Sequence, residues 1–254
     1  MIDIHSHVLY GLDDGARTLE DSLAMIRVAA EHGTTDLVAT PHASPDYSFD
    51  PERIQERLNE LAAASPGIPR LYPGCDCHLT YDNIQDAIDH PAKYAIAHNK
   101  YLLVEFSDFL ILQNTAEIFA RLGDAGLIPI VTHPERNPLL RQRIEEIAQW
   151  VENGASLQIT AQSLMGRFGR KARDFCRALL ERGLVHFIAS DAHDCEHRPP
   201  RLDEAHEWMT ANYGSAAADL LCTVNPRATL EGASVEAFRP KTKPSSRKWR
   251  SFWR

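Results

Sequence analysis

Short hydrophobic runs with β-strand character alternate along the chain with longer segments whose apolar residues recur at helical spacing. The strand-like runs lie at residues 2–5, 36–40, 70–75, 101–106, 128–132, 155–160 and 186–190. Helical periodicity is clearest at residues 18–32, 141–152 and 167–182, and a glycine closely follows each of these segments. This alternation predicts an α/β fold in which seven βα units surround a parallel sheet.

Histidines and carboxylates stand where several of these runs end. They are His5, His7, His42, Glu105, His133, Asp191 and His193. In an α/β barrel every strand delivers its last residue to one common mouth, so residues remote in sequence can meet there. Because such residues follow both the first and the last run, these two strands are expected to lie close together, which predicts a closed or nearly closed barrel.

The residue types in this set indicate a metal site. Neutral imidazole suits Zn, Mn, Fe and Co, and carboxylates bridge such ions and balance their charge. The pattern therefore predicts a multinuclear metal hydrolase, although any single histidine at a strand end is more often a capping or core residue. The other histidines, which fall in predicted helices, loops or strand starts, are expected to be structural or exposed: His32, His78, His90, His98, His186, His197 and His206.

Length and composition favour one catalytic domain. The chain has 254 residues and 44% hydrophobic content, close to the roughly 250 residues of a single α/β barrel. No run of about 18 apolar residues is present, so no membrane-spanning helix is expected. His5 and His7 stand so near the first residue that a removable leader is not expected either. Five cysteines without a regular framework fit a reducing compartment, and a cytoplasmic location is predicted.

Two cysteine patterns have simple structural explanations. Cys75 and Cys77 alternate within a strand-like run and have no second cysteine pair to complete a zinc site, so both are expected in the core. Cys176 and Arg182 match the C-x5-R spacing of cysteine-based tyrosine phosphatases. They fall inside a predicted helix, however, whose interior has no free N–H groups to bind a phosphate, so we interpret this match as accidental.

The C-terminal segment, residues 239–254, differs from the rest of the chain. It carries seven Lys or Arg and no acidic residue, whereas residues 1–238 carry 20 basic and 35 acidic side chains. Trp249, Phe252 and Trp253 have helical spacing. The segment is interpreted either as a disordered, solvated tail or as a weak docking element for an anionic membrane or an acidic partner. An acidic body with one short basic tail predicts no nucleic-acid partner.

Several short motifs accompany the strand-end residues. They are Met1-Ile2-Asp3-Ile4-His5-Ser6-His7, Asp13-Asp14-Gly15, Thr40-Pro41-His42, Glu105-Phe106-Ser107, His133-Pro134-Glu135-Arg136, Ala189-Ser190-Asp191-Ala192-His193 and Arg198-Pro199-Pro200. With these motifs, residues 1–236 resemble the PHP (polymerase and histidinol phosphatase) superfamily, and within it the bacterial manganese-dependent protein-tyrosine phosphatases of capsule and exopolysaccharide operons. The resemblance implies a distorted (β/α)7 TIM-like barrel holding three metal ions, with manganese expected and iron, cobalt or zinc as alternatives.

The resemblance also implies roles for individual residues. It assigns His5, His7, Asp14, His42, Glu105, His133, Asp191 and His193 as metal ligands. Asp76 stands where the family usually has a bridging Glu, and we assign it as a ninth ligand although it is one methylene shorter. Arg136 and Arg198 are the implied phosphate clamps, a role that uses the paired N–H donors that Lys lacks. His42 and Asp191 are the candidate acids for the leaving group.

The implied substrate is the phosphorylated, tyrosine-rich tail of a membrane-associated tyrosine autokinase that controls capsule or exopolysaccharide synthesis. Three alternatives remain open: a PHP phosphatase of a small molecule such as histidinol phosphate, an amidohydrolase-type barrel, and an inactive, metal-stabilised adaptor. Amidohydrolases typically use a carboxylated lysine, and no lysine lies at a predicted strand end. Residues 43–50 and 107–114 are expected to form the rim of the active site, with Asp46, Tyr47, Asp108 and Phe109 unassigned.

Overall fold

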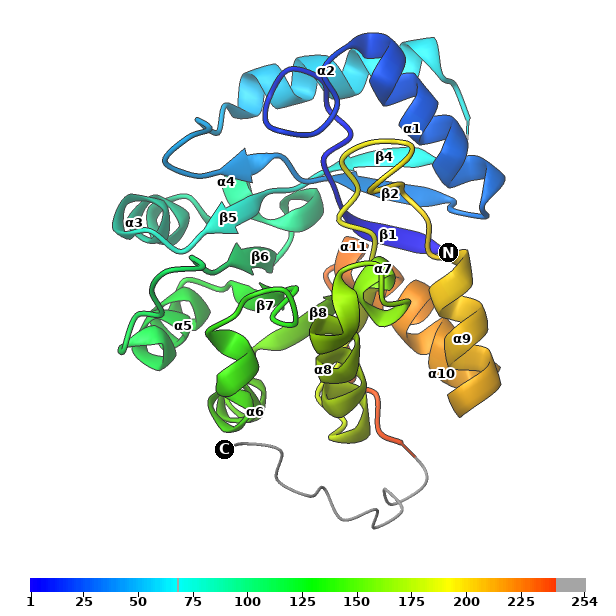
Figure 1. Cartoon of the computed structure of the whole chain (residues 1–254). Coiled ribbons are helices and arrows are strands. Elements are labelled where there is room, and N and C mark those ends of the chain that lie inside the picture. The colour runs from blue at the N-terminus through cyan, green and yellow to red at the C-terminus, as the bar shows by residue number, and fades with distance from the viewer. Residues whose placement is uncertain (68, 241–254) are drawn as a thin grey trace.

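Two parallel sheets form the wall of the fold. The computed structural model describes residues 1–67 and 69–240, so Trp249, Phe252 and Trp253 of the basic segment lie outside the described residues (Figure 1). The first sheet has the order β1-β2-β4 and consists of β1 (Ile2–Ser6), β2 (Asp36–Ala39) and β4 (Arg70–Pro73). The second follows the order β3-β5-β6-β7-β8-β9 and consists of β3 (His42–Ala43), β5 (Asp76–His78), β6 (Tyr101–Glu105), β7 (Ile128–Thr132), β8 (Ser156–Thr160) and β9 (Phe187–Ala189).

The two sheets join into one barrel. β3 resumes the path of β2, and β5 that of β4, each after a gap of two residues. On the other side, the chain after β9 closes onto β1: Asp191 N–H donates to the His5 carbonyl at 2.9 Å, and His7 N–H to the Ala192 carbonyl at 2.8 Å. The predicted α/β barrel is therefore confirmed, as is the contact between its first and last strands.

Two predicted strands end early in the structure, and each is followed by a short strand that the sequence did not predict. The runs at residues 36–40 and 70–75 were expected to be continuous, yet β2 ends at Ala39 and β4 ends at Pro73. Pro41 has no N–H to offer the sheet, so the ladder beside it breaks and resumes at His42. The break creates the short strands β3 and β5, which carry His42 and Asp76 to the mouth of the barrel.

Helices cover the outside of the wall (Figure 1). The predicted helix at residues 18–32 forms α1, and Thr18 caps its first turn by accepting the Asp21 N–H. The helix predicted at 141–152 is split, because residues 140–142 form a 3-10 turn (η2) before α6 begins. The main helices are α1 (Leu19–Glu31), α2 (Pro51–Ala64), α3 (Tyr81–Asp89), α5 (Thr115–Asp124), α6 (Ile144–Glu152), α8 (Gly169–Glu181) and α9 (Asp203–Tyr213). Shorter helices and turns are α4 (Pro91–Tyr94), η1 (Ile96–His98), α7 (Ala161–Leu164), α10 (Ser215–Asp219), η3 (Leu220–Val224) and α11 (Asn225–Leu230).

The hydrophobic core has parts inside and outside the wall. Ile4, Leu103, Ile130 and Phe187 belong to one buried cluster although their strands are not all neighbours, so they meet inside the barrel. Outside, helices cover the opposite strand faces with larger clusters, which include the buried Cys75, Cys77 and Cys176 as expected. Within residues 1–67 and 69–240, no helix is both long and apolar enough to cross a membrane. The described chain remains packed on the barrel as far as Phe238, whose N–H donates to the Val185 carbonyl.

Candidate metal centre

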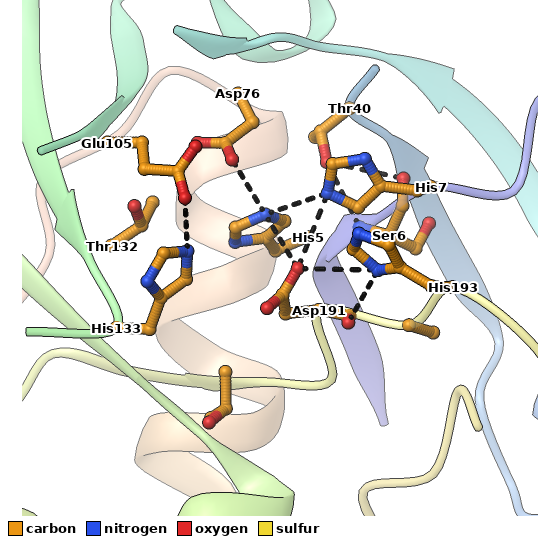
Figure 2. A network of polar contacts seen from close by, with 12 residues as sticks. His5, Ser6, His7, Thr40, Asp76, Glu105, Thr132, His133, Asp191 and His193 are labelled. Atoms are coloured by element: carbon orange, nitrogen blue, oxygen red, sulfur yellow. Dashed lines mark hydrogen bonds and ion pairs between the residues drawn. The ribbon is translucent and has the colours of Figure 1, made fainter. Parts of the chain in front are cut away.

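The strand-end side chains meet at the carboxyl mouth of the barrel (Figure 2). His5 lies on β1 and His7 directly follows that strand, and their Nε2 atoms face each other at 3.3 Å. Asp191, which follows β9, brings Oδ1 within 3.4 Å of His5 Nε2 and within 3.3 Å of His7 Nε2. Residues more than 180 positions apart in the sequence are thereby brought into one cluster.

A second part of the cluster surrounds His42. Its Nε2 lies 3.4 Å from Oδ1 of Asp14, and the same oxygen is 3.3 Å from Nε2 of His193. His133 Nε2 lies 3.6 Å from Glu105 Oε1. The structure therefore brings together all nine side chains expected at the mouth, in overlapping groups whose nitrogen and oxygen atoms lie within 4.8 Å of one another: His5, His7, Asp14, His42, Asp76, Glu105, His133, Asp191 and His193.

Asp76 reaches the middle of this cluster despite its short side chain. Its Oδ2 lies 3.4 Å from His5 Nε2 and 3.3 Å from His42 Nδ1. Both carboxylate oxygens are buried and have no hydrogen-bond partner, and His42 Nδ1 has none either. Leaving buried ionic oxygens without partners is costly. A set of inward-facing, unpartnered nitrogen and oxygen atoms fits divalent metal ions.

Burial and neighbouring charges shift the pKa values of the clustered histidines in opposite directions. Burial alone would lower the pKa of His42, but the nearby carboxylates of Asp14 and Asp76 raise that pKa to about 11. Burial lowers the pKa of His193 to about 2 and holds the pKa of His133 well below its ordinary value. The neutral imidazoles have lone pairs available, whereas His42 holds a proton that a metal ion would have to displace.

Two further residues orient the histidines of β1, and the sequence reasoning did not assign them this role. Asp13 Oδ2 accepts from His7 Nδ1 at 2.6 Å, and Gln158 Oε1 accepts from His5 Nδ1 at 3.0 Å. Each contact leaves Nε2 directed into the cluster, the arrangement by which an outer partner fixes the tautomer of a ligand. The Asp13-Asp14-Gly15 motif could have indicated the role of Asp13. Gln158 belongs to no motif, so only its position on β8 could have indicated its role.

His78, which was expected to be structural or exposed, lies half-buried beside the cluster. His78 Nε2 lies 2.5 Å from Glu105 Oε2, and the residue forms a potential ligand group with His42 and Glu105. The reason lies in the extra strand β5, since a residue two positions beyond Asp76 on a strand points to the same face. Hydrogen bonding to Glu105 raises the pKa of His78.

The two arginines lie at the edge of the cluster and converge on one acceptor. Arg136 and Arg198 both donate to Oδ2 of Asp191, in the case of Arg198 at 2.6 Å. A hollow of about 410 Å³ opens beside Arg136, Glu105 and His133. Cationic N–H donors at the entrance of a metal cluster are suited to binding an anionic substrate group.

The predicted rim is present in part. Asp108 and Phe109 line the hollow, and the Phe109 side chain is 94% exposed. Tyr47 stacks on His42 with ring centroids 6.0 Å apart, whereas Asp46 is exposed in the preceding turn. The segment after β6 therefore contributes more directly to the hollow than the segment after β3.

Gly15 lies so close to His7 that an alanine would displace the Asp13-Asp14 segment. A Cβ atom on Gly15 would lie 2.2 Å from the His7 carbonyl oxygen and 2.5 Å from His7 Cβ. Gly15→Ala is therefore expected to weaken metal binding by at least about 10-fold, as loss of ligand-orienting contacts does. Metal titration of the stripped protein measures this, and metal affinity like that of wild type would contradict it. Gly123→Ala, where a Cβ meets nothing within 4 Å, is the matched control.

A closed parallel barrel with a buried nitrogen and oxygen donor cluster at its carboxyl mouth is the architecture of metal-dependent hydrolases. Within that class the chain belongs to the CpsB/CapC family of capsular polysaccharide synthesis, whose family model matches residues 1–231.

Individual relatives agree with this assignment. The tyrosine-protein phosphatase YwqE of Bacillus subtilis (strain 168) is 32% identical over 252 residues, which cover 98% of each chain. CapC of Staphylococcus aureus is 38% identical over 209 residues, covering 80% of this chain and 81% of its own. CpsB of Streptococcus agalactiae serotype V, also named a tyrosine-protein phosphatase, is 29% identical over 245 residues, with coverage of 91% and 98%.

Solved structures show the same fold. A crystal structure from work on YwqE of Bacillus subtilis and CpsB of Streptococcus pneumoniae, described as unique metal-dependent tyrosine phosphatases, matches with a TM-score of 0.87 and 32% identity. The match covers 94% of this chain and 98% of that one. A β-aspartyl dipeptidase from Fervidobacterium islandicum matches at 13% identity and a TM-score of 0.54, over 93% of this chain and 75% of its own, which shows the barrel alone.

Proposed function

We propose that this chain is a metal-dependent protein-tyrosine phosphatase. The observation that carries the proposal is the cluster of buried, unpartnered donor atoms beside two convergent arginines. A metal cluster and paired guanidinium groups are together suited to a phosphate monoester, whose dianion repels a nucleophile unless its charge is masked. The relatives named as tyrosine-protein phosphatases over most of this chain's length support the same reaction.

The nine clustered side chains are the proposed ligands, and manganese is the proposed metal, with three ions expected and iron, cobalt or zinc as alternatives. When bound, such ions neutralise phosphoryl charge and lower the pKa of a bound water from 15.7 to about 7. Asp13 and Gln158 hold His7 and His5 in the tautomer that leaves Nε2 free. Two observations support the assignment: the short distances between the nitrogen and oxygen atoms of these side chains, and the buried oxygens of Asp76 that have no hydrogen-bond partner.

Arg136 and Arg198 are proposed to bind the phosphoryl oxygens and to stabilise their charge as the bond to the leaving group loosens. The convergence of both on one carboxylate oxygen supports this role, because a phosphate oxygen is a similar acceptor. The tyrosine leaving group has a pKa of about 10, so it needs little protonation. Of His42 and Asp191, the residue that does not coordinate an ion in the substrate complex is proposed to supply that proton.

The proposed substrate is the phosphorylated tyrosine-rich tail of a membrane-associated kinase that controls capsule or exopolysaccharide synthesis, reached from the cytoplasm. The experiment that tests the function measures phosphate release from a tyrosine-phosphorylated peptide after Mn²⁺ is added to stripped protein. Histidinol phosphate serves as the competing substrate. Preferential hydrolysis of histidinol phosphate would replace the proposal by a small-molecule phosphatase. Absence of hydrolysis with Mn, Co, Fe and Zn, with partner binding retained, would indicate an adaptor.

Metal binding is expected to release about one proton per protein at neutral pH, because the metal-free His42 has a pKa raised to about 11 and must lose its proton to become a ligand. Mn²⁺ affinity should therefore rise with pH between 6 and 8. Calorimetric titration in buffers of different ionisation enthalpy measures the proton count, and His42→Gln should abolish it. An affinity that does not change with pH would contradict the expectation.

The basic segment is proposed to add weak contact with an anionic membrane surface, as its seven positive charges suggest. Removing residues 239–254 is expected to reduce co-sedimentation with vesicles containing anionic lipid, while peptide hydrolysis in solution stays as in the full chain. Neutral vesicles provide the control for electrostatic attraction. Equal vesicle binding by the shortened and full-length proteins would reject the contact.

A further inference from the structure

Phe168 lies against both arginines at the edge of the metal centre. Its ring centroid is 4.7 Å from Cζ of Arg136 and 6.0 Å from Cζ of Arg198. The same ring lines the hollow that opens beside Glu105 and His133. One aromatic side chain is therefore placed to act on both guanidinium groups at once, within the range at which an aromatic face attracts a cation.

The two guanidinium groups need such a partner because they are neighbouring, half-buried cations. Burial lowers the pKa of Arg136, and the neighbouring charge of Arg198 lowers it further. Asp191 accepts a hydrogen bond from each arginine, but it offers one carboxylate to two cations. An aromatic ring attracts the flat face of a guanidinium group and leaves the N–H edges free to donate in the plane.

The position of Phe168 is set by helix packing that is independent of the metal cluster. Phe168 immediately precedes α8, and Ala172, one turn further along that helix, lines the same hollow. The preceding residue, Arg167, donates through Nη2 to both carboxylate oxygens of Glu204 on α9, each at 3.1 Å. This ion pair connects the turn that carries Phe168 to α9, the helix that follows Arg198 in the sequence.

We propose that Phe168 is a positioning residue that keeps Arg136 and Arg198 together as one fork for the phosphoryl oxygens. This inference rests on the proposed function and deepens it. The ring lies within 4.7 Å and 6.0 Å of the two guanidinium carbons, and both arginines donate to a single acceptor, which is Oδ2 of Asp191 in this structure. The aromatic character of the ring is what the role requires, because an aliphatic side chain of similar size fills the space without attracting the cations.

The test measures binding of inorganic phosphate to the metal-loaded protein by calorimetry, with metal affinity measured in parallel. Phe168→Leu is expected to weaken phosphate binding about 10-fold, whereas Phe168→Tyr keeps it within about three-fold, because only the latter retains an aromatic face. Metal affinity should not change in either variant. Phe175→Leu is the matched control, since this partly buried phenylalanine of the same helix packs against the outer core. Phe168→Met replaces the leucine variant if that variant does not fold.

A mutant cycle makes the test specific for the arginines. In an Arg136→Gln background, Phe168→Leu is expected to weaken phosphate binding by less than about three-fold, because the closer of the two cations is already absent. The proposal is overturned if Phe168→Leu binds phosphate like wild type, if Phe168→Tyr is as weak as Phe168→Leu, or if the loss is equally large in the Arg136→Gln background. Phosphate binding requires no turnover, so failure of the wild type to hydrolyse a phosphotyrosine peptide would count against the proposed function alone.

Discussion

Replacing His133 by alanine is expected to lower Mn²⁺-dependent hydrolysis of a phosphotyrosine peptide by more than about 100-fold, since even outer partners of metal ligands cost 10–100-fold. His133 Nε2 faces Glu105 Oε1 at 3.6 Å, and burial keeps the imidazole neutral by holding its pKa well below the ordinary value. The alanine variant loses the imidazole nitrogen of the ligand group that His133 forms with Glu105 and Asp76. The measurement is phosphate release by stripped protein titrated with Mn²⁺.

The control for this variant is another histidine that lies away from the cluster. His90 is 65% exposed and contacts Asp86 on α3, so His90→Ala should retain the activity of the wild type. Circular dichroism establishes that both variants fold. Full activity of folded His133→Ala protein would show that this residue is not required in the metal centre, and the proposed ligand set would then have to be reduced.

Exchanging either clamp arginine for lysine is expected to lower kcat/KM for the phosphotyrosine peptide by about 100- to 1000-fold, the usual cost of removing a charge-stabilising donor from an active site. Lysine keeps the positive charge but is a point donor, whereas Arg136 and Arg198 offer paired N–H groups in one plane. Each arginine donates one N–H to the same oxygen of Asp191, and the other N–H groups of each plane can bind further phosphoryl oxygens. Steady-state kinetics at saturating Mn²⁺ measures the effect.

Metal affinity separates this prediction from the first one. Arg136→Lys and Arg198→Lys should bind Mn²⁺ about as well as wild type, because neither arginine belongs to the nitrogen and oxygen ligand groups. Arg201→Lys is the matched control, since Arg201 pairs with Asp203 at the start of α9. Wild-type kinetics in both clamp variants would remove the arginines from the proposed mechanism.

The barrel was largely predictable because its signals are local. Each strand position could be read from a short hydrophobic run, and the alternation with helices left a parallel barrel as the expected arrangement. Where the prediction departed from the structure, a backbone feature had intervened. Pro41 follows the predicted run at 36–40, and the short strands that resume beyond the predicted runs place His42 and Asp76 in the cluster.

The candidate site was predictable in its residue types but less so in its contacts. His78 was overlooked because its position two residues beyond Asp76 matters only once β5 exists as a strand. Gln158 and Phe168 carry no motif, and each was recognisable only when β8 and the turn before α8 came to lie beside the mouth. Partners of this kind come from other elements, so no local pattern in the sequence marks them.

The sequence by itself determined which residues end the strands and therefore which chemistry could gather at the mouth. Tertiary structure alone decided where those side chains point. Between Asp3 and Ser6 the register of β1 against β2 shifts, so that Ile4 and His5 together stand opposite one residue of β2. His133 and Asp191 adopt positive φ values of 31° and 53°. Such backbone conformations are unfavourable locally and persist only because the surrounding barrel holds them, which is why short-range sequence patterns do not reveal them.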